Sequence, residues 1–167
     1  MSERIAVYPG SFDPVTFGHL DILDRSAAIF DRVLVGVLEN PGKTPLFTAE
    51  ERVELISACL ESRPRIQVTT FRGLTVDFAA NSGAIAIVRG LRAVSDFETE
   101  FQMALMNRRL NPAVNTVFLM TSFTNVFISS SLIKEVCHLG GNVSEMAPPV
   151  SVEAMRRRFA EERERDE

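Results

Sequence analysis

The chain has 167 residues, of which 46% are hydrophobic and 24% charged, a composition typical of one globular domain with a buried core. Eighteen basic and twenty-two acidic residues give a net charge of −4, which argues against a general nucleic-acid surface, so any anion must be bound by local geometry. No apolar run is long enough to cross a bilayer and no leader precedes the first strand, so we expect a cytoplasmic protein without a membrane partner. Cys59 and Cys137 lack metal-ligand spacing and are expected to fill the core in a reducing compartment.

Strands and helices are expected to alternate along the chain. Short apolar runs predict strands at 5–8, 32–38, 66–71, 85–88 and 116–120. Helical periodicity and capping residues predict helices at 18–30, 48–60, 74–81, 95–110 and 129–139, and a last helix from 151 onward. The C-terminal helix, at 150–167, ends in a dense mixture of both charges, which we expect to be solvated and to fray.

Specific residues mark the ends of several elements. Pro9-Gly10 should end the first strand, because proline offers no donor to the ladder. The residues at 48–51 and at 95–98 match capping boxes, and the glycines at 140–141 should end a helix. Because strands alternate with helices, we expect right-handed βαβ units and a doubly wound five-stranded parallel sheet in a single α/β domain spanning 1–167. In such sheets ligands bind beyond the carboxyl ends of the strands.

The stretch from Ile5 to His19, IAVYPGSFDPVTFGH, is typical of a strand, a tight loop and the start of a helix. This pattern places His19 at a helix N-terminus, where unpaired N–H groups and the positive end of the macrodipole can bind phosphate. Gly18 would let the phosphate approach closely, and the imidazole of His19 could donate to a phosphoryl oxygen whose charge grows in the transition state. Taken alone, the Gly-His pair favours a surface histidine that caps a helix, whereas the whole stretch favours a phosphate site.

Three further segments place cations or hydroxyl groups at the same edge of the sheet. Lys43 lies in a loop after the second strand. Arg89 and Arg92 follow the fourth strand, where a guanidinium can donate two parallel hydrogen bonds to phosphate oxygens. The three serines at 129–131 would open a helix and offer hydroxyl and N–H groups. Together these segments predict a ligand that carries several phosphates. Each has a plainer alternative: a solvated lysine, a serine N-cap, or an ion pair of the arginines with Asp96 or Glu98.

Four segments resemble those of one enzyme family. They are YPGSFDPVTFGH at 8–19, which contains a T/H-x-G-H motif, KTPLFTAEER at 43–52, RGLRAVSDFETE at 89–100 and FISSSLIKEV at 127–136. They span nearly the whole chain and are similar to those of the phosphopantetheine adenylyltransferases, nucleotidyltransferases with a Rossmann-like fold. The resemblance implies transfer of AMP from ATP to 4′-phosphopantetheine with Mg²⁺, giving dephospho-coenzyme A and pyrophosphate. It also implies a homohexamer and feedback inhibition by coenzyme A.

The resemblance implies roles for individual residues. The catalytic residues would be His19, Lys43, Arg92 and Ser130, and the acceptor-binding residues would be Ser11, Lys43, Thr75 and Arg89. The residues implied in ATP binding are Ser11, Phe12, His19, Gly90, Leu91, Arg92, Glu100, Asn125, Val126, Phe127, Ile128, Ser129, Ser130 and Ser131. Leu74 and Met106 would either form apolar contacts with the pantetheine arm or pack in the core. Thr99 and Asn125 stand where the family often has an aromatic residue, so we expect Asn125 to contact adenine through its backbone.

The implied reaction needs no general base, because its nucleophile is a phosphate oxygen that is already ionised. Fixed cations, helix N-termini and a positioned histidine would accelerate it by orientation and electrostatics. One alternative is an adenylyl- or cytidylyltransferase that uses another phosphorylated acceptor, such as nicotinamide mononucleotide; Lys43, Arg89 and the serines argue against it. The other is a non-catalytic nucleotide or coenzyme A sensor, which would not need His19, Lys43 and Arg92 together.

Overall fold

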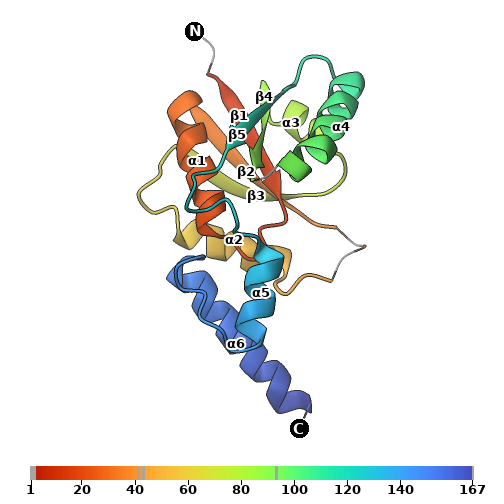
Figure 1. Cartoon of the computed structure of the whole chain (residues 1–167). Helices are drawn as coiled ribbons and strands as arrows, with labels where there is room; N and C mark the ends of the chain where they lie inside the picture. The colour runs from red at the N-terminus through yellow and green to blue at the C-terminus, as the bar shows by residue number, and fades with distance from the viewer. Residues whose placement is uncertain (1–2, 41, 43, 93, 167) are drawn as a thin grey trace.

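The computed structural model describes residues 3–40, 42, 44–92 and 94–166, which form a layered α/β structure (Figure 1). The strands are β1 (Ile5–Gly10), β2 (Arg32–Leu38), β3 (Ile66–Phe71), β4 (Ala86–Leu91) and β5 (Asn115–Met120). The helices are α1 (Phe17–Ile29), α2 (Ala49–Ala58), α3 (Thr75–Asn81), α4 (Val94–Leu110), α5 (Ser130–His138) and α6 (Pro149–Asp166). None of the helices in these ranges is both long and apolar enough to span a bilayer.

The sheet is parallel throughout, with the strand order β3-β2-β1-β4-β5. Side chains alternate between its two faces: Ala6 and Tyr8 of β1 enter a core cluster with α1, α2, α5 and α6, whereas Ile5 and Val7 enter a second cluster with α3. Helices therefore cover both faces, and the expected doubly wound five-stranded parallel sheet is confirmed. Figure 1 shows α5 and α6 beyond the carboxyl ends of the strands.

β1 and β4 separate at the carboxyl edge of the sheet. Their register pairs Ala6 with Ala86 and Val7 with Ile87, whereas β1 pairs with β2 along its whole length. In the strand order β3-β2-β1-β4-β5, the chain reverses its direction of winding between β1 and β4. A crevice at this switch point is where parallel sheets bind ligands.

The boundaries of four elements differ from those the sequence predicts. β1 runs to Gly10 because Pro9 lies beyond the stretch paired with β4, where a missing N–H costs no ladder bond on that side. β4 runs to Leu91, and α4 already begins at Val94, so Ser95 lies inside the helix and is not its N-cap. α6 begins at Pro149, since proline fits the first turn of a helix. The capping box at 48–51 marks the start of α2 as predicted, whereas the pattern at 95–98 does not mark the start of α4.

Candidate active site

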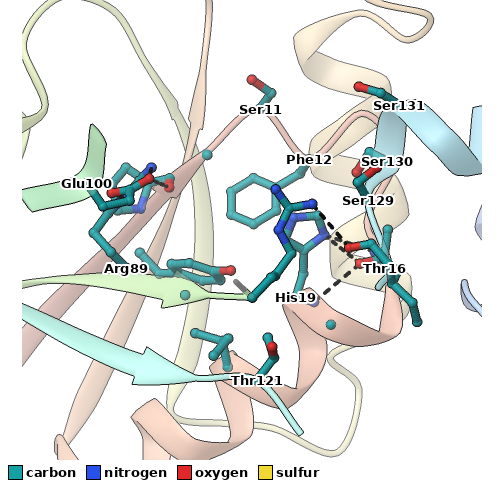
Figure 2. Close-up of a pocket in the computed structure, with 18 of the residues that line it drawn as sticks. Ser11, Phe12, Thr16, His19, Arg89, Glu100, Thr121, Ser129, Ser130 and Ser131 are labelled. Atoms are coloured by element: carbon teal, nitrogen blue, oxygen red, sulfur yellow. Dashed lines mark hydrogen bonds and ion pairs between the residues drawn. The ribbon is translucent and has the colours of Figure 1, made fainter. Parts of the chain in front are cut away.

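A cavity of about 470 Å³ lies where β1 and β4 separate. Its walls come from the ends of these strands, the first turns of α1 and α5, and one face of α4. Figure 2 shows Arg89 and Glu100 on one side, the serines at 129–131 on the other, and His19 between them. A cavity therefore lies at the carboxyl edge of the sheet, where the sequence predicts a ligand site.

His19 occupies the third position of α1 and forms a capping box with Thr16. The Thr16 hydroxyl accepts from the backbone N–H of His19 at 3.4 Å, and the Thr16 backbone N–H donates to Nδ1 of the imidazole at 3.1 Å. His19 also lines the cavity. The helix cap expected from the plainer alternative is therefore present, although His19 is not a surface residue, and one ring nitrogen caps the helix while the other is left for a ligand.

The environment of His19 keeps the imidazole neutral. Burial and, second, the charge of Arg92 lower the pKa of His19 from 6.5 to about 4. Nδ1 accepts the Thr16 N–H, so the single ring proton resides on Nε2. A neutral imidazole with a fixed tautomer can donate one hydrogen bond to a phosphoryl oxygen without first taking up a proton.

Arg89 is held by a bidentate ion pair with Glu100. Nε donates to Oε2 at 2.6 Å and Nη2 donates to Oε1 at 2.5 Å, while Nη1 donates to the Pro9 carbonyl at 2.9 Å. Burial opposes the charge of Arg89, but the hydrogen bonds and charge of Glu100 outweigh it and raise the Arg89 pKa. The sequence left open an ion pair with Asp96 or Glu98; the partner in the structure is Glu100, a residue implied in ATP binding. The pair fixes the Arg89 guanidinium at the cavity wall.

Opposite this pair, α5 presents its first turn to the cavity. Ser129 is the N-cap, its hydroxyl accepting from Leu132 N–H at 3.2 Å, as the plain N-cap alternative predicts for one serine. The Ser130 hydroxyl donates to the Pro14 carbonyl at 2.9 Å, which ties α5 to the loop before α1. Nη1 of Arg92 donates to the Ile128 carbonyl at 3.3 Å. Two helix N-termini and a guanidinium therefore face one cavity, an arrangement that suits polyphosphate.

The loop between β1 and α1 is fixed by Phe12. Its side chain is 2% exposed, and its ring lies 5.3 Å from Tyr8 and 5.0 Å from His19 between ring centroids. The backbone of Phe12 has a φ of +50°, a strained conformation that surrounding packing must enforce. A Cβ at Gly10 would lie 3.0 Å from the Phe12 ring, so a larger residue there would require the ring to shift. Because the ring is in the core, Phe12 presents its backbone to a ligand.

A second cavity of about 240 Å³ adjoins the first. The two share residues of the β1–α1 loop and α5, and the second is bounded further by Asn40, Thr44 and Pro45. Lys134 and Asp13 also line it and form an ion pair. The second cavity extends the site toward the loop that carries Lys43.

The structure brings most of the predicted site residues together. Those that line the first cavity are Ser11, Phe12, His19, Arg89, Gly90, Arg92, Glu100, Ile128, Ser129, Ser130 and Ser131, and Thr99 joins them. Those that line neither cavity are Thr75, Leu91, Asn125, Val126 and Phe127. Lys43 lies outside the described residues. Asn125 belongs to the turn between β5 and α5, where its carbonyl accepts from Ile128 N–H at 3.1 Å.

The structure also bears on the two apolar residues considered for the pantetheine arm. Leu74 is 54% exposed and Met106 is 56% exposed, so the core-packing alternative is wrong for both. Neither lines the two cavities. Met106 belongs instead to a largely exposed apolar surface on α4.

The donor set of the site bears on where Mg²⁺ could bind. Within the described residues, no three histidine, cysteine, aspartate or glutamate side chains gather as a metal cage. The cavity carboxylates Asp13 and Glu100 are each paired with a cation. Mg²⁺ in nucleotide enzymes is commonly held by substrate phosphates and water with few protein ligands. Among the described residues, the site therefore offers no ready set of protein ligands for Mg²⁺, and an ion there would be held mainly by the phosphates of a ligand.

Sequence reasoning did not assign Asp13, Lys134, Arg52 or Tyr8 to the site. Lys134 follows Ser130 by four residues on α5, a spacing that puts both on one helix face and could have identified it. Arg52 is 4% exposed and donates to the Ser11 carbonyl at 2.7 Å, a long-range contact that no local pattern encodes. The Tyr8 side chain is buried beside the cavity, and this burial raises its pKa, so its hydroxyl stays protonated.

Comparison with known proteins agrees with this geometry. Residues 7–136 match the family model described as cytidylyltransferase-like. A protein from Vibrio parahaemolyticus, described as a nicotinate-nucleotide adenylyltransferase, has the same fold, with a TM-score of 0.69, 17% identity, and 96% of this chain and 97% of that chain covered.

Curated relatives define the family more narrowly. The phosphopantetheine adenylyltransferase of Caldanaerobacter subterraneus is 51% identical over 156 residues, covering 93% of this chain and 98% of the relative. That of Heliobacterium modesticaldum is 54% identical over 157 residues, covering 94% of each. That of Alkaliphilus metalliredigens is 53% identical over 152 residues, covering 91% of this chain and 97% of the relative. Because identity above half extends over nearly the whole of each protein, this chain belongs to the phosphopantetheine adenylyltransferase family.

Proposed function

We propose that this chain transfers AMP from ATP to 4′-phosphopantetheine, releasing pyrophosphate and forming dephospho-coenzyme A. An oxygen of the acceptor phosphate attacks the α-phosphorus of ATP, and the bond from that phosphorus to the bridging oxygen of pyrophosphate breaks. The observation that best supports this reaction is the cavity at the switch point, where a neutral His19 at the N-terminus of α1 faces the N-terminus of α5, Arg89 and Arg92.

His19 stabilises the transition state by donating from Nε2 to a phosphoryl oxygen. The attack adds charge to the oxygens of the α-phosphorus, and a donor already aligned by Thr16 costs no reorganisation when that charge forms. Arg92 and the N-terminus of α5, with Ser130 contributing its backbone N–H, bind the outer phosphates of ATP. No proton has to leave the nucleophile, so no residue of the site is assigned as a base.

The acceptor phosphate binds toward Arg89 and Lys43 in this proposal. Arg89 is fixed by Glu100 and the Pro9 carbonyl, so its position does not depend on the ligand. Ser11 lies between the ATP end and the second cavity and can contact either phosphate. Thr75 contacts the pantetheine arm through its backbone. Phe127 and Asn125 contribute to the adenine side of the ATP site.

Mg²⁺ is the proposed cofactor, and it would enter the site bound to ATP. When bound, it neutralises charge on the phosphates. The site residues hold those phosphates through hydroxyl, N–H and guanidinium groups. Chelation of the metal should abolish pyrophosphate release, and added Mg²⁺ should restore it.

Pyrophosphate release from the purified protein tests the reaction and its acceptor. The assay contains ATP and Mg²⁺ with 4′-phosphopantetheine, with nicotinamide mononucleotide, or with no acceptor. Release that requires 4′-phosphopantetheine supports the proposal. Release with nicotinamide mononucleotide would assign another acceptor, and ATP binding without release under any condition would favour a sensor.

A homohexamer is proposed for the assembly. α4 exposes Phe97, Phe101, Met103, Leu105, Met106 and Leu110, each at least 44% accessible. Large apolar side chains left exposed in such number on one helix are typical of a protein that associates with other chains. Light scattering after size exclusion tests this, since six times the 18.6 kDa chain mass is expected and a monomer would contradict it.

Coenzyme A is proposed as a feedback inhibitor, because it shares the adenylyl and pantetheine parts of the product. Inhibition that is competitive with 4′-phosphopantetheine would support binding in the same cavities. We also propose a cytoplasmic location, which the free thiols of Cys59 and Cys137 support.

A further inference from the structure

The segment that forms one wall of the second cavity is held in place by distant side chains. Thr44 and Pro45 line the cavity opposite α5, and the chain then passes through Leu46 and Phe47 to the start of α2. This segment directly follows Lys43 in the sequence. A wall built from a loop needs fixed backbone contacts if it is to hold a ligand group in a defined position.

Asp13 fixes this segment from the side of the active-site loop. Its Oδ2 accepts from Leu46 N–H and its Oδ1 accepts from Phe47 N–H, both at 3.0 Å. Lys134 of α5 forms an ion pair with the same carboxylate. The Asp13 side chain is only 8% exposed, and a carboxylate so buried is stable only while these donors satisfy it. Asp13 therefore joins the wall to the loop between β1 and α1.

Arg158 of α6 fixes the same segment from the opposite side. Nη1 donates to the Leu46 carbonyl at 2.8 Å, and Nη2 donates to Oε1 of Glu51 at 2.5 Å. The guanidinium carbon lies 5.4 Å from the centroid of the Phe47 ring. The other carboxylate oxygen of Glu51 accepts from Thr48 N–H at 2.8 Å. The peptide units from Leu46 to Thr48 are thus clamped between Asp13 and α6.

Arg158 differs from the two arginines before it in the run 156–158. Arg156 and Arg157 are exposed, and within the described residues neither makes a hydrogen bond or an ion pair. Arg158 is half-buried and contacts three residues of the wall and of α2. The charge pattern of α6 alone does not distinguish the three; the packing of α6 against α2 turns one of them inward.

We propose that α6 is a positioning element for adenylyl transfer, and that Arg158 acts through Leu46 and Phe47 to hold the wall of the second cavity against His19 and Ser130. Arg158 lines neither of the two site cavities, so its effect is indirect. The inference rests on the proposed function, because it assumes that the acceptor phosphate binds where the two cavities meet, next to this wall. Loss of the clamp should loosen the wall and weaken acceptor binding, while the ATP side, built from the first turns of α1 and α5, keeps its contacts.

Steady-state kinetics of three full-chain variants test the proposal. Arg158→Ala removes the clamp, Arg158→Lys keeps a charge that can reach either Leu46 or Glu51, and Arg157→Ala is the matched control on the same helix. We expect Arg158→Ala to raise the KM for 4′-phosphopantetheine about tenfold with an unchanged KM for ATP. Arg158→Lys should recover part of this loss, and Arg157→Ala should match the unmodified chain.

Backbone hydrogen exchange provides a readout that does not depend on turnover. The amides of Leu46 and Phe47 should exchange faster in Arg158→Ala than in Arg157→Ala, at a temperature where both are folded. Equal exchange and equal acceptor KM in these two variants would overturn the proposal. The proposal would also be overturned if Arg158→Ala lost only maximal velocity, in proportion to the fraction of unfolded protein, because such a loss is a purely structural effect.

The unmodified chain separates failure of this inference from failure of the proposed function. If it releases pyrophosphate with another phosphorylated acceptor, the proposed acceptor is wrong, and the same variants are compared with the acceptor that is used. If it releases none, the proposed function fails and the exchange of Leu46 and Phe47 decides whether Arg158 holds the wall.

Discussion

The Thr16 backbone N–H donates to Nδ1 of His19 across 3.1 Å, and the Thr16 hydroxyl lies 3.1 Å from the same nitrogen. This contact caps α1 and also orients the imidazole of His19, because it assigns the ring proton to Nε2 and restricts rotation of the ring. The cap and the site therefore share one histidine. In the proposed reaction, His19 therefore both stabilises α1 and donates a hydrogen bond to the transferred phosphoryl group.

Replacement of His19 should separate catalysis from folding. His19→Ala should lower kcat roughly 100-fold or more, because it removes a preorganised donor to the charge that develops on the phosphoryl oxygens. His19→Gln should lose less, since its amide can still donate near the position of Nε2. Both are measured by pyrophosphate release, with circular dichroism to show that the fold persists. An unaltered kcat in His19→Ala would remove His19 from the mechanism.

Thr16→Val should test the cap itself. The substitution keeps the size of this 2% exposed side chain but removes the hydroxyl that accepts from His19 N–H. We expect the free energy of unfolding to fall by about 1 kcal/mol. The Thr16 N–H still orients Nδ1, so kcat should fall less than in His19→Ala. Urea unfolding measures the first effect; a kcat loss as large as that of His19→Ala would mean that the hydroxyl is needed to orient the imidazole.

The lowered pKa of His19 predicts a pH dependence of stability. Because the folded value is about 4 and the ordinary value is 6.5, the unfolded chain takes up the proton first as the pH falls. The contribution of neutral His19 to the free energy of unfolding is therefore fully present above pH 6.5 and is lost as the pH falls from 6.5 toward 4. His19→Gln should lack this component.

Proton NMR of the ligand-free protein measures the same pKa directly. The chain has two histidines, and the spectrum of His19→Gln assigns the remaining signal to His138. The imidazole signal of His19 should shift with a midpoint near pH 4. A midpoint at the ordinary value would contradict the buried, Arg92-facing environment.

The Arg89–Glu100 pair predicts unequal effects of its two members. Arg89→Ala should mainly weaken binding of 4′-phosphopantetheine, because it removes the cation proposed to hold the acceptor phosphate. Glu100→Gln keeps the shape but removes the charge that fixes Arg89, and should lower the free energy of unfolding by roughly 2 kcal/mol. Titration calorimetry measures acceptor affinity in both variants, and normal affinity in Arg89→Ala would refute its assigned role.

The sequence determined the alternation of strands and helices, since buried parallel strands are continuous apolar runs and helix starts carry capping residues. It also determined that His19 and the serines of α5 lie at helix N-termini, because those patterns are local. Tertiary structure decided what local patterns do not contain: the separation of β1 and β4 that opens the cavity, and the choice of Glu100 as partner of Arg89. It also decided which arginine of α6 turns inward. These features depend on contacts between residues far apart in the chain, whose distances are set only when the sheet and its helices pack.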